Sequence, residues 1–168
     1  MDRQALQKIS YGLYVVSSTR QGKHNGQIAN AVCQVTAEPP QIAFSINKQN
    51  LTHEFIQESK ILAASILAKT TPLRFIANFG FWSGRDRDKF KDVKYEFGVT
   101  GAPLLLENTI ARMEVEIFDN RDAGTHTVFI GKAVNAEVIK DEEVMTYAYY
   151  HRVKHGGVPK TAPTYLKP

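Results

Sequence analysis

Cysteine is almost absent from this chain. The 168 residues include a single one, Cys33, so no disulfide can form within the chain. This usage is typical of proteins from reducing compartments. A second cysteine ligand for a metal is also lacking, and no zinc-type spacing of ligands occurs. We therefore expect no metal centre, and we expect Cys33 to be a small buried residue.

Long hydrophobic runs are also lacking. No apolar stretch approaches the roughly 20 residues that a membrane-spanning helix needs. The N-terminal residues 1–4 do not show the charged-then-apolar pattern of a signal peptide. These absences predict a cytoplasmic protein without a membrane partner.

A strong excess of one charge is missing as well. The net charge is +4 and the isoelectric point about 9.1. Between residues 85 and 94 the basic side chains alternate with acidic ones, which is unlike the continuous basic stripe of a nucleic-acid-binding surface. We expect no nucleic-acid partner, although the mild excess favours small anions such as nucleotides.

Several chemical fingerprints do not occur. The chain has neither GxGxxG nor GxxxxGK[ST], so the common dinucleotide-binding and phosphate-binding loops are excluded. No Ser/His/Asp triad and no paired carboxylates stand out. A chain without an obvious acid, base or nucleophile either binds a ligand or leaves the chemistry to a cofactor.

Short strands separated by turn signals are what the chain does contain. Their spacing predicts a mainly β domain with added helices, an antiparallel barrel or sandwich, over residues 1–155. Periodicity leaves segment 60–67 open between strand and helix. The other expected elements are a helix at 2–9, a turn at 21–26, strands at 13–18, 27–36, 41–47, 110–118 and 125–139, helices at 71–79 and 141–151, a loop at 80–98 and an extended tail at 156–168.

Two strands carry informative alternation. In strand 27–36, one face holds small residues such as Ala29 and Ala31, which would let a flat ligand approach the backbone. The alternative is an ordinary buried strand. In strand 110–118, the alternation predicts that Arg112, Glu114 and Glu116 lie on the outer face.

Three segments are candidates for binding chemistry. Asn50 is placed to cap a helix whose free amides would bind phosphate, aided by Lys48 and Thr52; the alternative is a plain capped helix. The loop after residue 82 offers amides at Ser83 and Gly84, with cations at Arg85 and Lys89, or is simply a solvated loop. The remaining candidate, His126, lies at the start of a long strand. It either has a structural role or interacts with charge that develops on a ligand during a reaction.

Taken in order, four segments resemble the flavin reductase-like family of FMN-binding split β-barrels. They are Val35–Pro40, Asn47–His53, Phe79–Phe90 and Gly124–Gly131, and the resemblance extends from Ile9 to Tyr150. The archaeal ferric reductases and the flavin domains that precede rubredoxin are the most similar types.

The resemblance implies an antiparallel split β-barrel, a homodimer and one noncovalent FMN per subunit, reduced by NADH or NADPH. It implies an NAD(P)H-dependent oxidoreductase that passes electrons to free flavin, ferric iron or a small redox protein. The alternatives are an FMN electron carrier for a rubredoxin or flavodiiron partner, and a non-enzymatic flavin-binding module. It places His126 beside flavin and nicotinamide as the catalytic residue. The implied cofactor-binding residues are Gln27, Ile28, Ala29, Asn30, Ala31, Val32, Asn47, Lys48, Asn50, Leu51, Thr52, Ser83, Gly84, Arg85 and Lys89.

Overall fold

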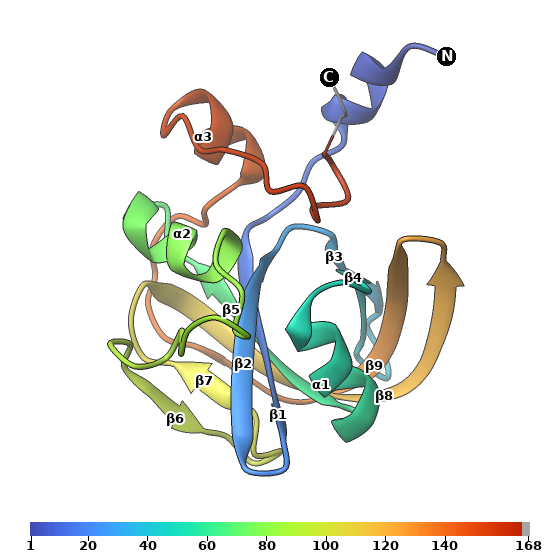
Figure 1. The fold of residues 1–168 in the computed structure, drawn as a ribbon, viewed down its shortest axis with the longest axis vertical. Helices are drawn as coiled ribbons and strands as arrows, with labels where there is room; N and C mark the ends of the chain where they lie inside the picture. The colour runs from blue at the N-terminus through green and yellow to red at the C-terminus, as the bar shows by residue number, and fades with distance from the viewer. Residues whose placement is uncertain (166–168) are drawn as a thin grey trace.

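One seven-stranded antiparallel sheet, in the order β2-β1-β5-β8-β9-β4-β3, forms the frame of the protein in a computed structural model that describes residues 1–165 (Figure 1). A separate two-stranded sheet pairs β6 with β7. The elements are η1 (Arg3–Lys8), β1 (Tyr14–Arg20), β2 (Lys23–Ala29), β3 (Val32–Thr36), β4 (Gln41–Asn47), α1 (Leu51–Ser59), β5 (Ile61–Leu67), α2 (Leu73–Gly80), β6 (Tyr95–Phe97), β7 (Pro103–Leu105), β8 (Thr109–Ala123), β9 (His126–Val138) and α3 (Tyr147–Arg152).

The expected strand at 27–36 is in fact two strands, and the single-strand prediction is wrong. The chain breaks at Asn30 and Ala31, so that β2 forms one edge of the sheet and β3 the other. The sheet curls but does not close, and the predicted antiparallel split β-barrel is confirmed. The break was not visible in the sequence because neither glycine nor proline occurs between residues 27 and 36 to mark it.

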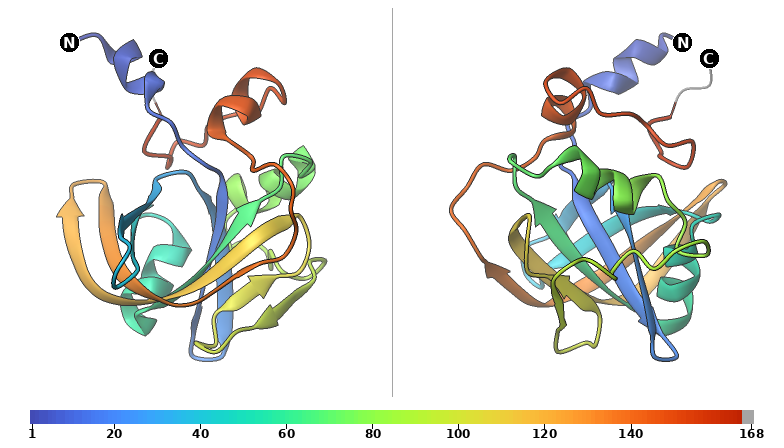
Figure 2. Two further views of the ribbon diagram at one scale, coloured as in Figure 1. Left: turned by 180° about the vertical axis from the view of Figure 1, so that it is seen from behind. Right: turned by 60° about the vertical axis from the view of Figure 1, so that its left-hand side comes forward.

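One apolar core cluster joins strands of the curled sheet to α1, and Figures 1 and 2 show α1 beside the sheet. Asn50 is the N-cap residue of α1, as predicted, and Phe55 and Ile56 are buried beneath the helix. The core side chains are Val16, Ala29, Ile42, Phe44, Ile46, Ile56, Leu62, Ala64, Val115, Ile117 and Phe129.

A second apolar cluster lies beneath α2, where Phe75, Ile76 and Phe79 are buried. The predicted helix at 71–79 is present as α2, but its N-cap is Pro72. The Thr71 hydroxyl donates to the Asn108 carbonyl at 3.0 Å. The segment left open at 60–67 is strand β5, which pairs with both β1 and β8.

The outer face predicted for 110–118 is largely covered, which is a correction. Glu114 is fully buried and Arg112 is 9% exposed, whereas Glu116 is exposed as predicted. The Glu114 carboxylate accepts hydrogen bonds from the Thr100 and Val99 amides, the Thr100 hydroxyl and the Asn135 side chain. The turn between β6 and β7 supplies the Val99 and Thr100 contacts, β9 supplies Asn135, and the fold-back of this turn over β8 depends on tertiary structure.

The chain ends differ from their predictions. The helix at 2–9 is the 3-10 helix η1, capped by Asp2, and it projects away from the sheet in every view (Figure 2). The helix expected at 141–151 is limited to α3. The tail expected to be extended forms turns at 160–164, and residues 166–168 lie outside the described part. Cys33 is exposed, contrary to expectation, because β3 is an edge strand.

Two smaller features complete the fold. The turn expected at 21–26 spans only Gln21 and Gly22. Gly131 pairs with Ile117, next to the shift in the register of β8 against β9 between Ile117 and Asp119. A Cβ at Gly131 would lie 2.6 Å from the Glu116 carbonyl oxygen, so the close approach of the two strands requires glycine.

Candidate functional site

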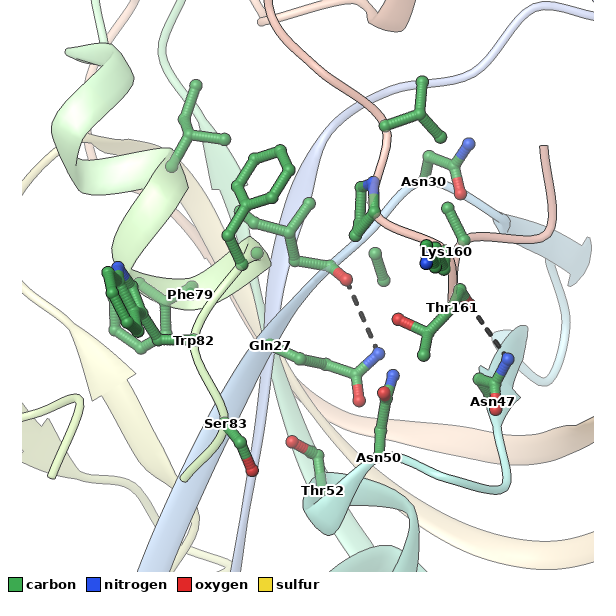
Figure 3. Close-up of a pocket in the computed structure, with 18 of the residues that line it drawn as sticks. Gln27, Asn30, Asn47, Asn50, Thr52, Phe79, Trp82, Ser83, Lys160 and Thr161 are labelled. Atoms are coloured by element: carbon green, nitrogen blue, oxygen red, sulfur yellow. Dashed lines mark hydrogen bonds between the residues drawn. The ribbon is translucent and has the colours of Figure 1, made fainter. Parts of the chain in front are cut away.

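A cavity of about 520 Å³ lies between the end of β2, the start of α1, the loop after α2 and the C-terminal tail (Figure 3). Cavities of roughly 300–1,000 Å³ are typical of small-molecule sites. One side of this cavity is aromatic, with Phe79, Phe81 and Trp82, while amide and hydroxyl side chains lie opposite. The residues come from widely separated parts of the chain, and the fold brings them together.

Most of the predicted site residues line this cavity. Ala31, Val32 and Lys48 are not part of the lining among the described residues. The Lys48 ammonium instead pairs with Asp122 at 2.6 Å, and this contact lowers the pKa of the Asp122 carboxyl. The lining includes Gln27, Ile28, Ala29, Asn30, Asn47, Asn50, Leu51, Thr52, Ser83, Gly84, Arg85, Lys89 and His126.

The start of α1 presents hydrogen-bond donors to the cavity. Asn50 makes no side-chain capping bond, so its amide is available to a ligand. The Thr52 hydroxyl accepts from the Asn25 side chain at 2.8 Å, which leaves its own hydrogen to donate. A helix N-terminus carries partial positive charge from its free N–H groups. This end of the cavity therefore suits an anion.

The loop after α2 closes over the same end. Arg85 donates to the Gln49 carbonyl at 3.1 Å and pairs with the Glu54 carboxylate, which ties the loop to α1. The Ser83 hydroxyl accepts from the Arg85 amide at 3.1 Å. A Cβ at Gly84 would lie 2.1 Å from the Asn25 amide oxygen, so only glycine permits this approach.

Lys89 is a buried cation in the cavity wall, 5% exposed. Its ammonium donates to the Gly26 carbonyl at 2.9 Å and to the Phe79 carbonyl at 3.1 Å. Burial, with a smaller contribution from the Arg87 charge, lowers the pKa of Lys89 to about 8. The side chain therefore connects β2 to the end of α2, and it keeps most of its charge at neutral pH.

His126 lies at the start of β9 and contacts the tail. Its Nε2 lies 3.2 Å from the Thr161 carbonyl oxygen, and its Nδ1 lies 2.8 Å from the Thr125 hydroxyl. Because a carbonyl can only accept, Nε2 carries the hydrogen and Nδ1 accepts from Thr125. Burial lowers the pKa of His126 more than the Thr161 bond raises it, which favours the neutral ring.

The tail and several polar side chains were missed at the sequence level. Residues 157–163 line the cavity, and the Asn47 side chain also donates to the Thr161 carbonyl, at 3.1 Å (Figure 3). Asn25, Gln49 and Ser45 are further lining residues. The three prolines of the tail indicated only the absence of regular structure, and no local signal indicated that it would fold back.

The chain is similar to known proteins over almost its whole length. A family model described as "Flavin reductase like domain" matches residues 6–157. The high molecular weight rubredoxin of Moorella thermoacetica is 50% identical over 165 residues, covering 98% of this chain and 72% of that protein. The ferric-chelate reductase (NAD(P)H) of Archaeoglobus fulgidus is 47% identical over 167 residues, covering 99% of each chain.

Solved structures show the same architecture. The NADH:FAD oxidoreductase of Streptomyces globisporus C-1027, in complex with NAD and FAD fragments, aligns with a TM-score of 0.74 at 25% identity. The alignment covers 86% of this chain and 87% of that one.

In the described part of this chain, no helix combines the length and apolar character needed to cross a membrane.

Proposed function

The chain belongs to the flavin reductase-like family, and we propose that it is an FMN-dependent oxidoreductase that takes hydride from NADH or NADPH. It passes the electrons to a diffusible acceptor, which is free flavin, ferric iron or a small redox protein. The observation that carries this proposal is a cavity with an aromatic wall, an unpaired buried acceptor and an anion-binding end.

The residues of the cavity fit the ring of a flavin. Gln27 Oε1 is buried and has no hydrogen-bond partner, so a ligand N–H would satisfy it. An isoalloxazine ring offers one such N–H between two carbonyl groups. Phe79 and Trp82 line the cavity as apolar surface for the rest of the ring (Figure 3).

The opposite end of the cavity fits the phosphate of FMN. The start of α1, the Thr52 hydroxyl and the loop at Ser83 converge there, and Arg85, paired with Glu54, holds this loop against α1. No Asp or Glu is present in the described lining, so an anion meets no like charge inside it. These residues would hold the ribityl phosphate.

Bound FMN would supply the redox chemistry, accepting hydride and releasing electrons singly or in pairs. The residues of the chain itself would bind the flavin and orient the nicotinamide nucleotide beside it. His126 and Asn47 hold the tail through the Thr161 carbonyl, and thereby shape the side of the cavity that faces the tail. We propose that His126 acts on the nicotinamide site through this contact.

Flavin binding and reduction test the function directly. The purified protein should bind FMN, seen by calorimetry and by the flavin absorption spectrum. In stopped-flow experiments, NADH or NADPH should bleach the flavin rapidly. A protein that binds no FMN would remove the basis of the proposal.

An electron-carrier function is the second candidate, favoured by the 50% identity to a high molecular weight rubredoxin. In that case the flavin would be reduced by a reduced protein partner and only slowly by NAD(P)H. FMN binding without reduction by either route would identify a non-enzymatic flavin-binding module.

Replacing Gly84 by alanine should weaken FMN binding. The new methyl group would collide with Asn25, which orients the Thr52 hydroxyl, so the loop or Asn25 must move. Overpacking of this kind costs about 1–2 kcal/mol, or roughly five- to thirtyfold in affinity. Titration of the apoprotein with FMN would measure the loss.

Gly80→Ala is the matched control for that variant. Gly80 also lines the cavity, but a Cβ there would make only an ordinary contact with Ile28, at 3.4 Å. Its FMN affinity should stay near that of the wild type. Equal affinities in both variants would show that the loop at Gly84 does not shape the phosphate site.

A homodimer is also part of the proposal. Exposed apolar side chains occur on η1 and along the β8–β9 hairpin, including Leu6, Phe118 and Val138, and they support a subunit contact. Light scattering at micromolar concentration should give about twice the 18.8 kDa mass of one chain. A mass near that of one chain with FMN bound would contradict the dimer.

Two further parts of the proposal concern location and boundaries. We propose a cytoplasmic location, supported by the single cysteine and by the need for NAD(P)H. We also propose that residues 1–155 form a flavin reductase-like domain and that residues 156–168 form a tail. The described part of the tail contributes to the cavity of that domain.

A further inference from the structure

The cations that line the cavity are not equivalent. Arg85 is paired with Glu54, and Lys89 is buried with its ammonium on two backbone carbonyls. Lys160 belongs to the tail, is exposed, and makes no ion pair within residues 1–165. Of these three, it is the cation whose charge is free for a ligand.

The backbone next to Lys160 is fixed by buried side chains. The Thr161 carbonyl accepts from Asn47 and His126, which are 7% and 8% exposed. Further along, Asn30 donates to the Thr164 hydroxyl at 3.3 Å. On the other side of Lys160, the Tyr150 hydroxyl donates to the Gly157 carbonyl at 3.0 Å. The tail is therefore held on both sides of Lys160, and its place at the cavity is set by the fold.

Lys160 lies on a different part of the cavity wall from the end assigned to the FMN phosphate. Lys160 and Thr161 lie on the tail, apart from Ser83 and Thr52, which line the end assigned to the FMN phosphate (Figure 3). A single FMN has one phosphate group and satisfies that end. A nicotinamide dinucleotide carries a diphosphate, and NADPH an additional 2′-phosphate, so a second phosphorylated ligand matches the charge of Lys160.

We propose that Lys160 contacts the phosphate groups of the nicotinamide dinucleotide, and that the tail at 157–163 forms the wall of its binding site. This inference rests on the proposed function. Lys160 contributes to affinity for the nucleotide and not to retention of FMN. An exposed lysine of this kind acts as a point charge, so its contribution should decrease as salt screens it.

Charge reversal at Lys160 tests the proposal. In the FMN-loaded protein, Lys160→Glu should raise the Kd for NAD⁺ or NADP⁺ by roughly five- to twentyfold, because repulsion replaces attraction. Perturbation of the flavin absorbance reports this binding without turnover. The loss should shrink at high ionic strength, and the Kd for FMN and the melting temperature should stay unchanged. A loss for both nucleotides identifies the diphosphate as the contact, and a loss for NADP⁺ alone identifies the 2′-phosphate.

Lys91→Glu is the matched control, since it changes the net charge equally at an exposed position outside the cavity lining. Equal Kd values for Lys160→Glu and Lys91→Glu would overturn the assignment of Lys160 while leaving the proposed function intact. Tighter nucleotide binding by Lys160→Glu would also overturn it, because the tail would then compete with the nucleotide. A wild-type protein that binds FMN but neither nucleotide would end both proposals.

Discussion

Replacing His126 by alanine should slow the reduction of bound flavin by NAD(P)H by roughly ten- to a thousandfold, while FMN binding stays nearly unchanged. The ring donates to the Thr161 carbonyl and thereby holds the tail against the cavity. Without this bond, Asn47 alone donates to that carbonyl, and the wall of the nicotinamide site loosens. Displacement of a ligand by about 1 Å is enough to cost on the order of a hundredfold in rate.

Stopped-flow reduction at several NAD(P)H concentrations separates the possible causes. We expect both a higher half-saturating concentration and a lower limiting rate. His126→Gln should recover part of the loss, because its amide can donate to the same carbonyl. A variant with a lower melting temperature but wild-type reduction kinetics in its folded fraction would restrict His126 to a structural role.

Glu114→Ala should destabilise the protein by about 3–5 kcal/mol. The carboxylate is fully buried and accepts four hydrogen bonds, from the Thr100 amide and hydroxyl, the Val99 amide and the Asn135 side chain. Removing it leaves the half-buried Thr100 amide and hydroxyl without their acceptor, and each such unsatisfied group costs about 1–3 kcal/mol. Urea unfolding measures the loss, with Glu116→Ala, exposed on the same strand, as the control.

The same carboxylate predicts how stability changes with pH. Burial raises the pKa of Glu114. The hydrogen bonds from Thr100, Asn135 and Val99 lower it by more than burial raises it, so the pKa lies below its ordinary value. A lowered pKa in the folded state means that the unfolded chain binds the proton more readily. The contribution is therefore present above about pH 4.3, the ordinary value for Glu. It is lost as pH falls through the folded-state pKa.

Unfolding experiments between about pH 3 and pH 6 check this direction. The free energy of unfolding of the wild type should fall as the solution becomes more acidic, and Glu114→Gln should show a shallower decrease, since it has no proton to bind at this position. Parallel curves for the two proteins would show that other carboxyl groups account for the acid sensitivity.

Local signals were sufficient for much of the fold. The strand expected at 41–47 is β4 with the same bounds, because the turn residues on either side of it act on their immediate neighbours. Asn50 predicted the start of α1, because capping depends on a few neighbouring residues. The motifs around Thr52, Ser83 and His126 predicted a ligand site, and the structure brings these residues to one cavity.

Tertiary structure decided the rest, since it depends on which distant segments meet. The division of 27–36 into β2 and β3 follows from the sheet curling until its two edges take consecutive parts of the chain. Glu114 is buried because residues 99 and 100 fold back over β8. The tail becomes part of the cavity because Asn47 and His126, more than 30 residues away along the chain, donate to the Thr161 carbonyl. Periodicity and capping act over a few residues, whereas these contacts join parts of the chain that only the fold brings together.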